Sequence, residues 1–271
     1  MKNRLAIGSV IAVATVVSVL WAQAPANPSQ AVAPAGGSQN ADTQKAKGKG
    51  GGKGRARITG PTPRLADGHP DLVGMWNGGG PVGDLMQGQA EKEAPLSETG
   101  KKEMAKRQSK DDPEANCLPT GVPRQAPYPW RIVTDPTHIY MLFEGNIHSF
   151  RQIFMDGRKH PVDPDPSWYG HSIGSWDGDT LVVDTVGYND KFWFDFRGHP
   201  HSEQLHTIER WTRKDLGTME NVVTIDDPVM YTKKFDVKYT ANLRQNDELM
   251  EYICQENQQD AQHLQGNAGL P

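Results

Sequence analysis

The sequence predicts a mainly β domain: an antiparallel meander, closed as a barrel or folded as a sandwich, with one short helix. Short apolar runs are separated by turn-forming dipeptides at intervals of roughly 8–12 residues, which is typical of hairpin-connected strands. Within Phe235–Thr240, apolar and polar residues alternate strictly, as a half-buried strand requires. The chain contains no evident internal repeat, which disfavours a propeller or a solenoid.

The first expected strand opens at Gly74-Met75-Trp76, and one helix is expected from Ser97 to about Lys110, before Pro113. Ser97 has the side chain of a helix N-cap, and a proline ends helices that precede it. The remaining predicted strands are Trp130–Thr134, His138–Glu144, His148–Met155, His171–Trp176, Thr180–Val186, Thr207–Lys214, Asn221–Asp226, Phe235–Leu243 and Glu248–Cys254. Dipeptides such as Asp156-Gly157 and Asp177-Gly178 supply the turns between them.

The N-terminus has the pattern of a secretory signal peptide over residues 1–26. Lys2 and Arg4 precede an uncharged run, Leu5–Leu20, and the small residues Ala24-Pro25-Ala26 follow as a cleavage site. The alternative is an uncleaved anchor, for which an apolar run of about 16 residues is short, since a span needs roughly 20. We therefore expect an exported protein, periplasmic or extracellular.

Residues 27–57 predict a disordered basic tether, because Ala, Pro, Ser, Gln and Gly dominate and a Lys/Gly/Arg tract ends the segment. A single β-rich domain is expected over residues 58–258, and a flexible tail over 259–271. The whole chain has 29 Lys plus Arg and 33 Asp plus Glu. Eight of the cations and one acid precede Ile58, which leaves 21 positive and 32 negative residues. A domain with this excess of acidic residues binds polyanions poorly, and no nucleic-acid partner is expected. Only the basic tether could contact an anionic component of the cell envelope.

The chain has two cysteines, Cys117 and Cys254. In an oxidising compartment a single pair so widely spaced predicts one disulfide, and the alternative is two free buried thiols. Neither cysteine lies in a Cys-x-x-Cys redox motif.

Two resemblances bear on the fold. Gly74-Met75-Trp76 resembles the Gly-x-Trp signature of the lipocalins and calycins, in which the tryptophan closes the bottom of a small-ligand barrel. The segments Lys110–Pro119, Trp176–Asp184 and Gly198–Ser202 together resemble a large group of secreted bacterial proteins without an assigned function. These resemblances imply export and one β-rich, lipocalin-like domain, but neither implies a reaction.

Four of the nine histidines lie between Trp168 and His206. His199, His201 and His206 are candidate ligands of a divalent transition metal such as zinc, with His171 as a further ligand. Such a centre would activate a bound water for a hydrolase or lyase. Pro200 indicates a loop, so the alternative is that these histidines are structural.

Acid–base chemistry without a metal is another interpretation of the same region. His171 or His201 could transfer protons if a carboxylate such as Asp184 or Glu203 fixed the imidazole tautomer. The chain contains no nucleophile elbow, Walker loop, dinucleotide-binding glycine motif or haem-attachment motif.

The densest aromatic region of the chain overlaps these histidines. Phe192–Phe196 has aromatic residues on both faces of an extended chain, so at least one face should line a pocket or a protein contact. A pocket for a small, partly apolar ligand is our leading hypothesis. The expected binding residues are Trp168, Tyr169, His171, Trp176, Tyr188 and Trp193. The histidine-based enzyme is the second hypothesis, and a cell-envelope adhesion module that uses the basic tether is the third.

Overall fold

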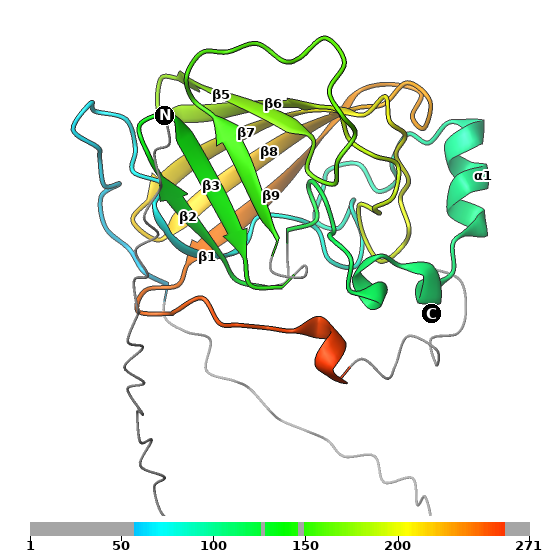
Figure 1. Ribbon diagram of the computed structural model, residues 1–271, viewed down its shortest axis with the longest axis horizontal. Helices are drawn as coiled ribbons and strands as arrows, with labels where there is room; N and C mark the ends of the chain where they lie inside the picture. The colour runs from blue at the N-terminus through cyan, green and yellow to red at the C-terminus, as the bar shows by residue number, and fades with distance from the viewer. Residues whose placement is uncertain (1–56, 126–127, 146–148, 258–271) are drawn as a thin grey trace, which may run out of the picture. The chain divides into compact units, whose positions relative to one another are not determined.

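The computed structural model describes residues 57–125, 128–145 and 149–257. The predicted signal peptide, nearly all of the predicted tether and the tail over 259–271 lie outside these residues. Nine strands form a closed barrel in which each strand pairs with its sequence neighbours and β1 pairs with β9 (Figure 1). The strands are β1 Gly74–Gly78, β2 Trp130–Thr134, β3 His138–Phe143, β4 Phe150–Phe154, β5 His171–Asp177, β6 Thr180–Val186, β7 His206–Asp215, β8 Thr218–Asp226 and β9 Phe235–Leu243. The prediction of a mainly β barrel with one short helix is confirmed.

One seam of the barrel departs from the predicted antiparallel meander. Strands β4 and β5 are parallel, and they pair through Ile153 with Ser172 and Phe154 with Ile173. Parallel neighbours cannot be joined by a tight turn, so the long connection from Met155 to Gly170 crosses over between them. All the other strand pairs, including the closing pair β1–β9, are antiparallel.

The helix α1, Glu98–Lys106, lies outside the barrel (Figure 1). Its predicted N-cap is confirmed, because the Ser97 hydroxyl accepts a hydrogen bond from the amide of Gly100 at 3.0 Å. The same hydroxyl donates to the carbonyl of Val229 at 2.7 Å, which ties the start of the helix to the loop after β8. The helix ends before the predicted Lys110, and two 3₁₀ turns, Ser109–Asp111 and Glu114–Asn116, follow it.

The predicted strand Glu248–Cys254 is wrong. Residues 244–253 contain no strand, and Cys254–Asn257 is a 3₁₀ turn. Because β1 already pairs with β9, the barrel has no free edge for another strand to join. The apolar side chains that suggested a strand remain at the surface, and Met250 is 65% exposed.

Large side chains are buried inside the barrel. Alternate residues of β6 and β8 are buried, as the two-residue period of a strand requires. Aromatic rings are buried beside β1, β2 and β7. The ring of Trp130 packs edge-on against that of Trp211, with the ring centroids 5.6 Å apart. Trp76 is fully buried there, and the guanidinium of Arg213 lies 4.9 Å from its ring centroid.

A buried ion pair crosses the lumen nearer the seam. Nη2 of Arg151 on β4 lies 2.5 Å from Oε2 of Glu209 on β7, and both side chains are almost completely buried. Arg151 also donates to Ser172 at 3.1 Å and to Thr185 at 2.9 Å. Burial opposes the charge of Arg151, but Glu209 outweighs it and the pKa of the guanidinium is raised. Arg151 and Glu209 therefore form a charge-compensated ion pair inside the barrel.

Candidate functional site: a cleft at the β4–β5 seam and two histidine networks

A cleft of about 590 Å³ lies beside the parallel seam. Most of its lining comes from β4, from the connection between β4 and β5, and from the first residue of β5, and Pro119 and Ser149 complete it. The lining residues are Pro119, Ser149, Phe150, Arg151, Gln152, Phe154, Pro161, Pro164, Asp165, Ser167, Trp168, Tyr169, Gly170 and His171. Three of the predicted ligand-binding residues, Trp168, Tyr169 and His171, are therefore part of one wall.

Backbone hydrogen bonds hold this wall in place. The amide of Ser167 donates to the carbonyl of Gly187 at 3.0 Å, and the amide of Asn189 donates to the carbonyl of Ser167 at 2.8 Å. Close contact at Gly187 adds to this anchoring, because a Cβ there would lie 2.7 Å from Pro164. Gly170 has φ +63°, and a Cβ at this position would lie 2.6 Å from the carbonyl oxygen of Val186. The wall is thus fastened to the end of β6 and to the residues that follow it.

Strand β4 contributes aromatic side chains to the lining of the cleft. Phe150 is 60% exposed although it is a large apolar residue. Phe154 stacks on His171 with ring centroids 5.0 Å apart, and the guanidinium of Arg158 lies 3.8 Å from its ring centroid. Burial, His160 and Arg158 together lower the pKa of His171. An uncharged imidazole at the cleft wall can both donate and accept a hydrogen bond.

The other three predicted ligand-binding residues lie elsewhere. Trp176 stacks on His69 with ring centroids 4.6 Å apart. Tyr188 is fully buried, and its hydroxyl lies 2.7 Å from that of Thr207. Trp193 is buried beneath the guanidinium of Arg107, 4.9 Å from the ring centroid. None of the three is among the residues that line the cleft.

The three predicted metal ligands do not converge. Among the described residues, the one group of His, Cys, Asp or Glu whose ligand atoms all lie within 4.8 Å of one another is Asp84, Asp195 and His199. His199 and His201 belong to a buried network around Phe192–Phe194, whereas His206 belongs to a second network with Asp184. The four histidines of the enzyme hypothesis are thus divided between two networks.

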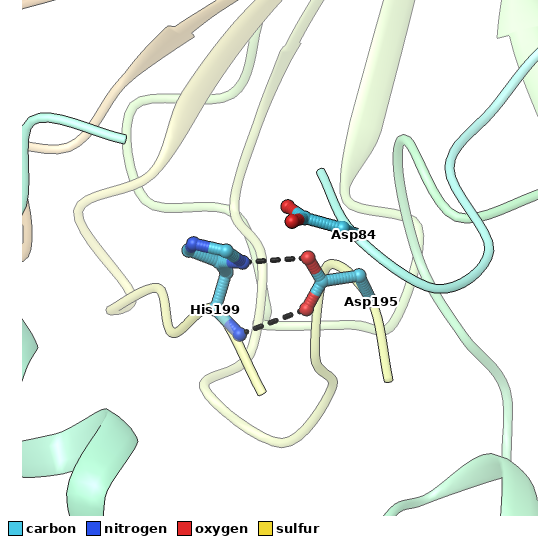
Figure 2. A group of neighbouring side chains, drawn as sticks. All are labelled: Asp84, Asp195 and His199. Atoms are coloured by element: carbon cyan, nitrogen blue, oxygen red, sulfur yellow. Dashed lines mark hydrogen bonds and ion pairs between the residues drawn. The ribbon is translucent and has the colours of Figure 1, made fainter. Parts of the chain in front are cut away.

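Figure 2 shows the group of Asp84, Asp195 and His199. Nδ1 of His199 donates to Oδ2 of Asp195 at 2.5 Å, and the His199 amide donates to Oδ1 at 3.1 Å. Oδ2 of Asp195 also accepts from the amide of Leu85. Both Asp195 and His199 are at most 1% exposed.

The carboxylate of Asp84 is equally well satisfied. It accepts from Arg197 and from the amide of Met86, both at 2.8 Å. Burial disfavours its ionised form, but the hydrogen bond from Arg197 and that amide outweigh burial, so the pKa of Asp84 is lowered. Because both carboxylates already accept several N–H donors, this group fastens the loop after β1 to the loop before β7, and its oxygens are committed to that role.

His201 is sealed in an aromatic site. Its ring centroid lies 3.7 Å from that of Phe192 and 5.2 Å from that of Phe194. Nδ1 lies 3.3 Å from the Ser202 carbonyl, and Nε2 has no hydrogen-bond partner in the described part of the chain. Burial lowers the pKa of His201 to about 3, so the ring is neutral at physiological pH.

The second network lies on the outer face of the barrel. Oδ1 of Asp184 accepts from Nε2 of His206 at 2.8 Å and from Nε2 of His160 at 3.2 Å. Nδ1 of His160 also lies 2.9 Å from Nδ1 of His171. Asp184 thus orients His160 and His206 rather than His171 directly, and the predicted partner Glu203 is exposed on the loop before β7. Sequence reasoning missed His160, which lies in the proline-rich connection.

The predicted disulfide between Cys117 and Cys254 is confirmed, with Cα atoms 5.7 Å apart. Such a bond is typical of proteins in an oxidising compartment. No helix in the described ranges is long and apolar enough to cross a membrane. Comparison of the chain with protein-family models, curated proteins and solved structures gave no match.

Proposed function

We propose that this protein binds a small, partly apolar molecule in the cleft at the β4–β5 seam. The observation that carries this proposal is the exposed aromatic wall: Phe150 is 60% exposed and faces a hollow of about 590 Å³. Ligand sites are usually hollows of roughly 300–1,000 Å³ with apolar walls and a few polar groups. An exposed phenylalanine loses contact with water when a ligand covers it, and this favours binding.

The polar groups of the lining favour a ligand that is not purely hydrocarbon. Gln152, Asp165 and His171 border the same hollow as Phe150 and Trp168. An amide, a carboxylate and a neutral imidazole can orient hydroxyl, amine or carbonyl groups. The segment around Trp168 is already held by backbone hydrogen bonds, so its conformation need not be fixed when a ligand binds. This lowers the entropic cost of binding.

The test is a titration with the neutral aromatic dye N-phenyl-1-naphthylamine, followed by its fluorescence. The parent protein should bind one dye molecule per chain. Trp168→Ala removes part of one wall and should weaken binding about 10–100-fold, as expected for roughly 1–3 kcal/mol of lost apolar contact.

Trp176→Ala is the matched control. Both tryptophans are half-buried and pack against the core, but Trp168 lines the cleft and Trp176 does not. The control should bind the dye as the parent does. Equal losses in both variants, or a parent protein that binds no dye, would contradict the proposal.

We also propose that the protein acts after export, in the periplasm or outside the cell. The predicted signal peptide over residues 1–26 and the disulfide support this location. Mass spectrometry of the protein secreted by its host should show a chain that begins after Ala26. A full-length chain confined to the cytoplasm would refute this proposal.

A further inference from the structure

Hydrogen bonds connect the histidine that borders the cleft to a carboxylate on the barrel. His171 begins β5 and is part of the cleft lining, and His160 comes from the connection between β4 and β5. Nδ1 of His160 lies 2.9 Å from Nδ1 of His171, and its Nε2 lies 3.2 Å from Oδ1 of Asp184. The same oxygen accepts from Nε2 of His206 at 2.8 Å. The contacts Asp184–His160–His171 therefore end at the cleft.

These contacts determine which ring nitrogens carry the protons. The side chain of Asp184 is 39% exposed, and an ionised carboxylate accepts hydrogen bonds but cannot donate them. Nε2 of His160 therefore carries a proton, and Nδ1 of the neutral ring is an acceptor. Its partner, Nδ1 of His171, must then be the donor. In the neutral ring of His171 this leaves Nε2 without a proton and able only to accept.

The acceptor at Nε2 of His171 is open to solvent. Within the described ranges, the hydrogen-bond contact of this ring is the one between Nδ1 and His160. Nε2 is not among the buried polar atoms that lack a partner, so it is unpaired and accessible. Burial, His160 and Arg158 lower the pKa of His171, so the ring is neutral at pH 7 and the lone pair of Nε2 is available.

The rest of the lining favours an uncharged aromatic group. Its charged members are Arg151 and Asp165. The charge of Arg151 is compensated by Glu209 at 2.5 Å, whereas Asp165 is exposed and would repel an anionic ligand. Phe150, which is 60% exposed, and Trp168 supply aromatic surface on which another ring can pack.

We propose that the cleft binds an uncharged aromatic molecule with a hydroxyl group, and that this hydroxyl donates to Nε2 of His171. This inference rests on the proposed function and narrows its ligand class. An ether of the same size has no proton to donate, so His171 discriminates against it. His160 and Asp184 are positioning residues: neither lines the cleft, but together they keep the proton of His171 on Nδ1.

The test compares the binding of 2-naphthol and 2-methoxynaphthalene by equilibrium dialysis at pH 7. The two molecules share one ring system and are both uncharged, but only 2-naphthol has an O–H group. The parent protein should bind 2-naphthol about tenfold more tightly, because the ether leaves the acceptor of His171 unpaired beneath it. The anion 2-naphthoate should bind more weakly than 2-naphthol.

Two variants separate the acceptor from the residue that positions it. His171→Phe keeps an aromatic ring at the cleft but removes the acceptor, so the ratio of the two dissociation constants should approach one. His160→Phe removes the partner of Nδ1 and lets the proton of His171 move to Nε2, so the ratio should also fall. A purely structural role of His160 would change both affinities in proportion and leave the ratio unchanged.

The proton position itself is measured by nitrogen-15 NMR of protein labelled at histidine. In the parent, Nδ1 of His171 should carry the proton and Nε2 should not. In His160→Phe, Nε2 of His171 should be at least partly protonated. This measurement needs no ligand, so it tests the positioning by His160 and Asp184 separately from binding.

His69→Phe is the matched control. His69 stacks on Trp176 with ring centroids 4.6 Å apart, much as His171 stacks on Phe154 at 5.0 Å, but it does not line the cleft. The control should keep the preference of the parent for 2-naphthol. Circular dichroism and thermal unfolding establish that each variant is folded.

The inference is overturned if the parent binds the dye but binds 2-naphthol and 2-methoxynaphthalene equally, or if NMR places the proton on Nε2 of its His171. It is also overturned if folded His171→Phe keeps the preference, or if 2-naphthoate binds more tightly than 2-naphthol. A parent that binds neither the dye nor any of the three naphthalene derivatives contradicts the cleft as a ligand site, so a failure of the proposed function is recognised separately.

Discussion

Acidification should destabilise this protein through His201. The ring is buried between Phe192 and Phe194, and its pKa is lowered to about 3 from an ordinary value of about 6.5. Between these two pH values the unfolded chain binds a proton that the folded chain does not, so stability falls as the pH falls. The slope is about 1.4 kcal/mol per pH unit, and the loss between pH 7 and pH 5 is about 2 kcal/mol.

Urea unfolding of the parent protein and of His201→Gln, each at pH 7 and pH 5, measures this loss. The variant lacks the titrating ring, so its stability should fall by about 2 kcal/mol less than that of the parent over the same interval. His69→Gln, which removes a half-exposed imidazole, is the control and should behave as the parent does. Equal pH dependence in the parent and His201→Gln would refute the argument.

Three further predictions concern stability. Arg151→Met should cost about 3–5 kcal/mol, because it leaves Glu209 buried without its partner, whereas the double variant Arg151→Met/Glu209→Leu should recover most of that loss in urea unfolding. A cystine-free variant, Cys117→Ser/Cys254→Ser, should lose about 2–5 kcal/mol by the same measurement, where the upper value is the chain-entropy limit for a separation of 137 residues. Gly170→Ala should cost about 1–3 kcal/mol and lower Tm, because its φ is +63° and a Cβ would meet the Val186 carbonyl.

Each of these three has a contradicting result. A single Arg151→Met variant as stable as the parent would show that the ion pair is not sealed from water. A disulfide-free variant with the parent's unfolding midpoint would mean that the bond does not restrict the unfolded chain. An unchanged Tm for Gly170→Ala would show that the wall of the cleft can shift without cost.

The sequence was sufficient for most of the strands but not for all of their pairing partners. The bounds predicted for Trp130–Thr134, Thr180–Val186 and Phe235–Leu243 are those of β2, β6 and β9, because alternation and turn residues act locally. The parallel seam could not be foreseen, since a two-residue period does not specify which neighbour a strand pairs with. The prediction of a strand over Glu248–Cys254 was wrong for a similar reason. Because β1 pairs with β9, the barrel has no free edge with which that segment could pair.

The site was less predictable than the fold. Trp168, Tyr169 and His171 are adjacent in sequence and lie together at the cleft. Proximity in sequence misled for the metal ligands, because the His199 backbone is held by Asp195 and the neighbouring Ser202 by Asp227, which turns this loop into the protein and away from His206. His160 joins His206 only through the crossover connection, a long-range contact that no local pattern encodes.

The parallel seam also determines where the barrel is easiest to open. Ile153 with Ser172 and Phe154 with Ile173 are the register pairs that join β4 to β5, whereas β7 and β8 are joined along almost their whole length. Local opening is least costly where few backbone hydrogen bonds and contacts must break. Amide hydrogen exchange should therefore be fastest among the strands at β4, and a molecule held in the adjoining cleft would slow it by bridging the two sides of the seam.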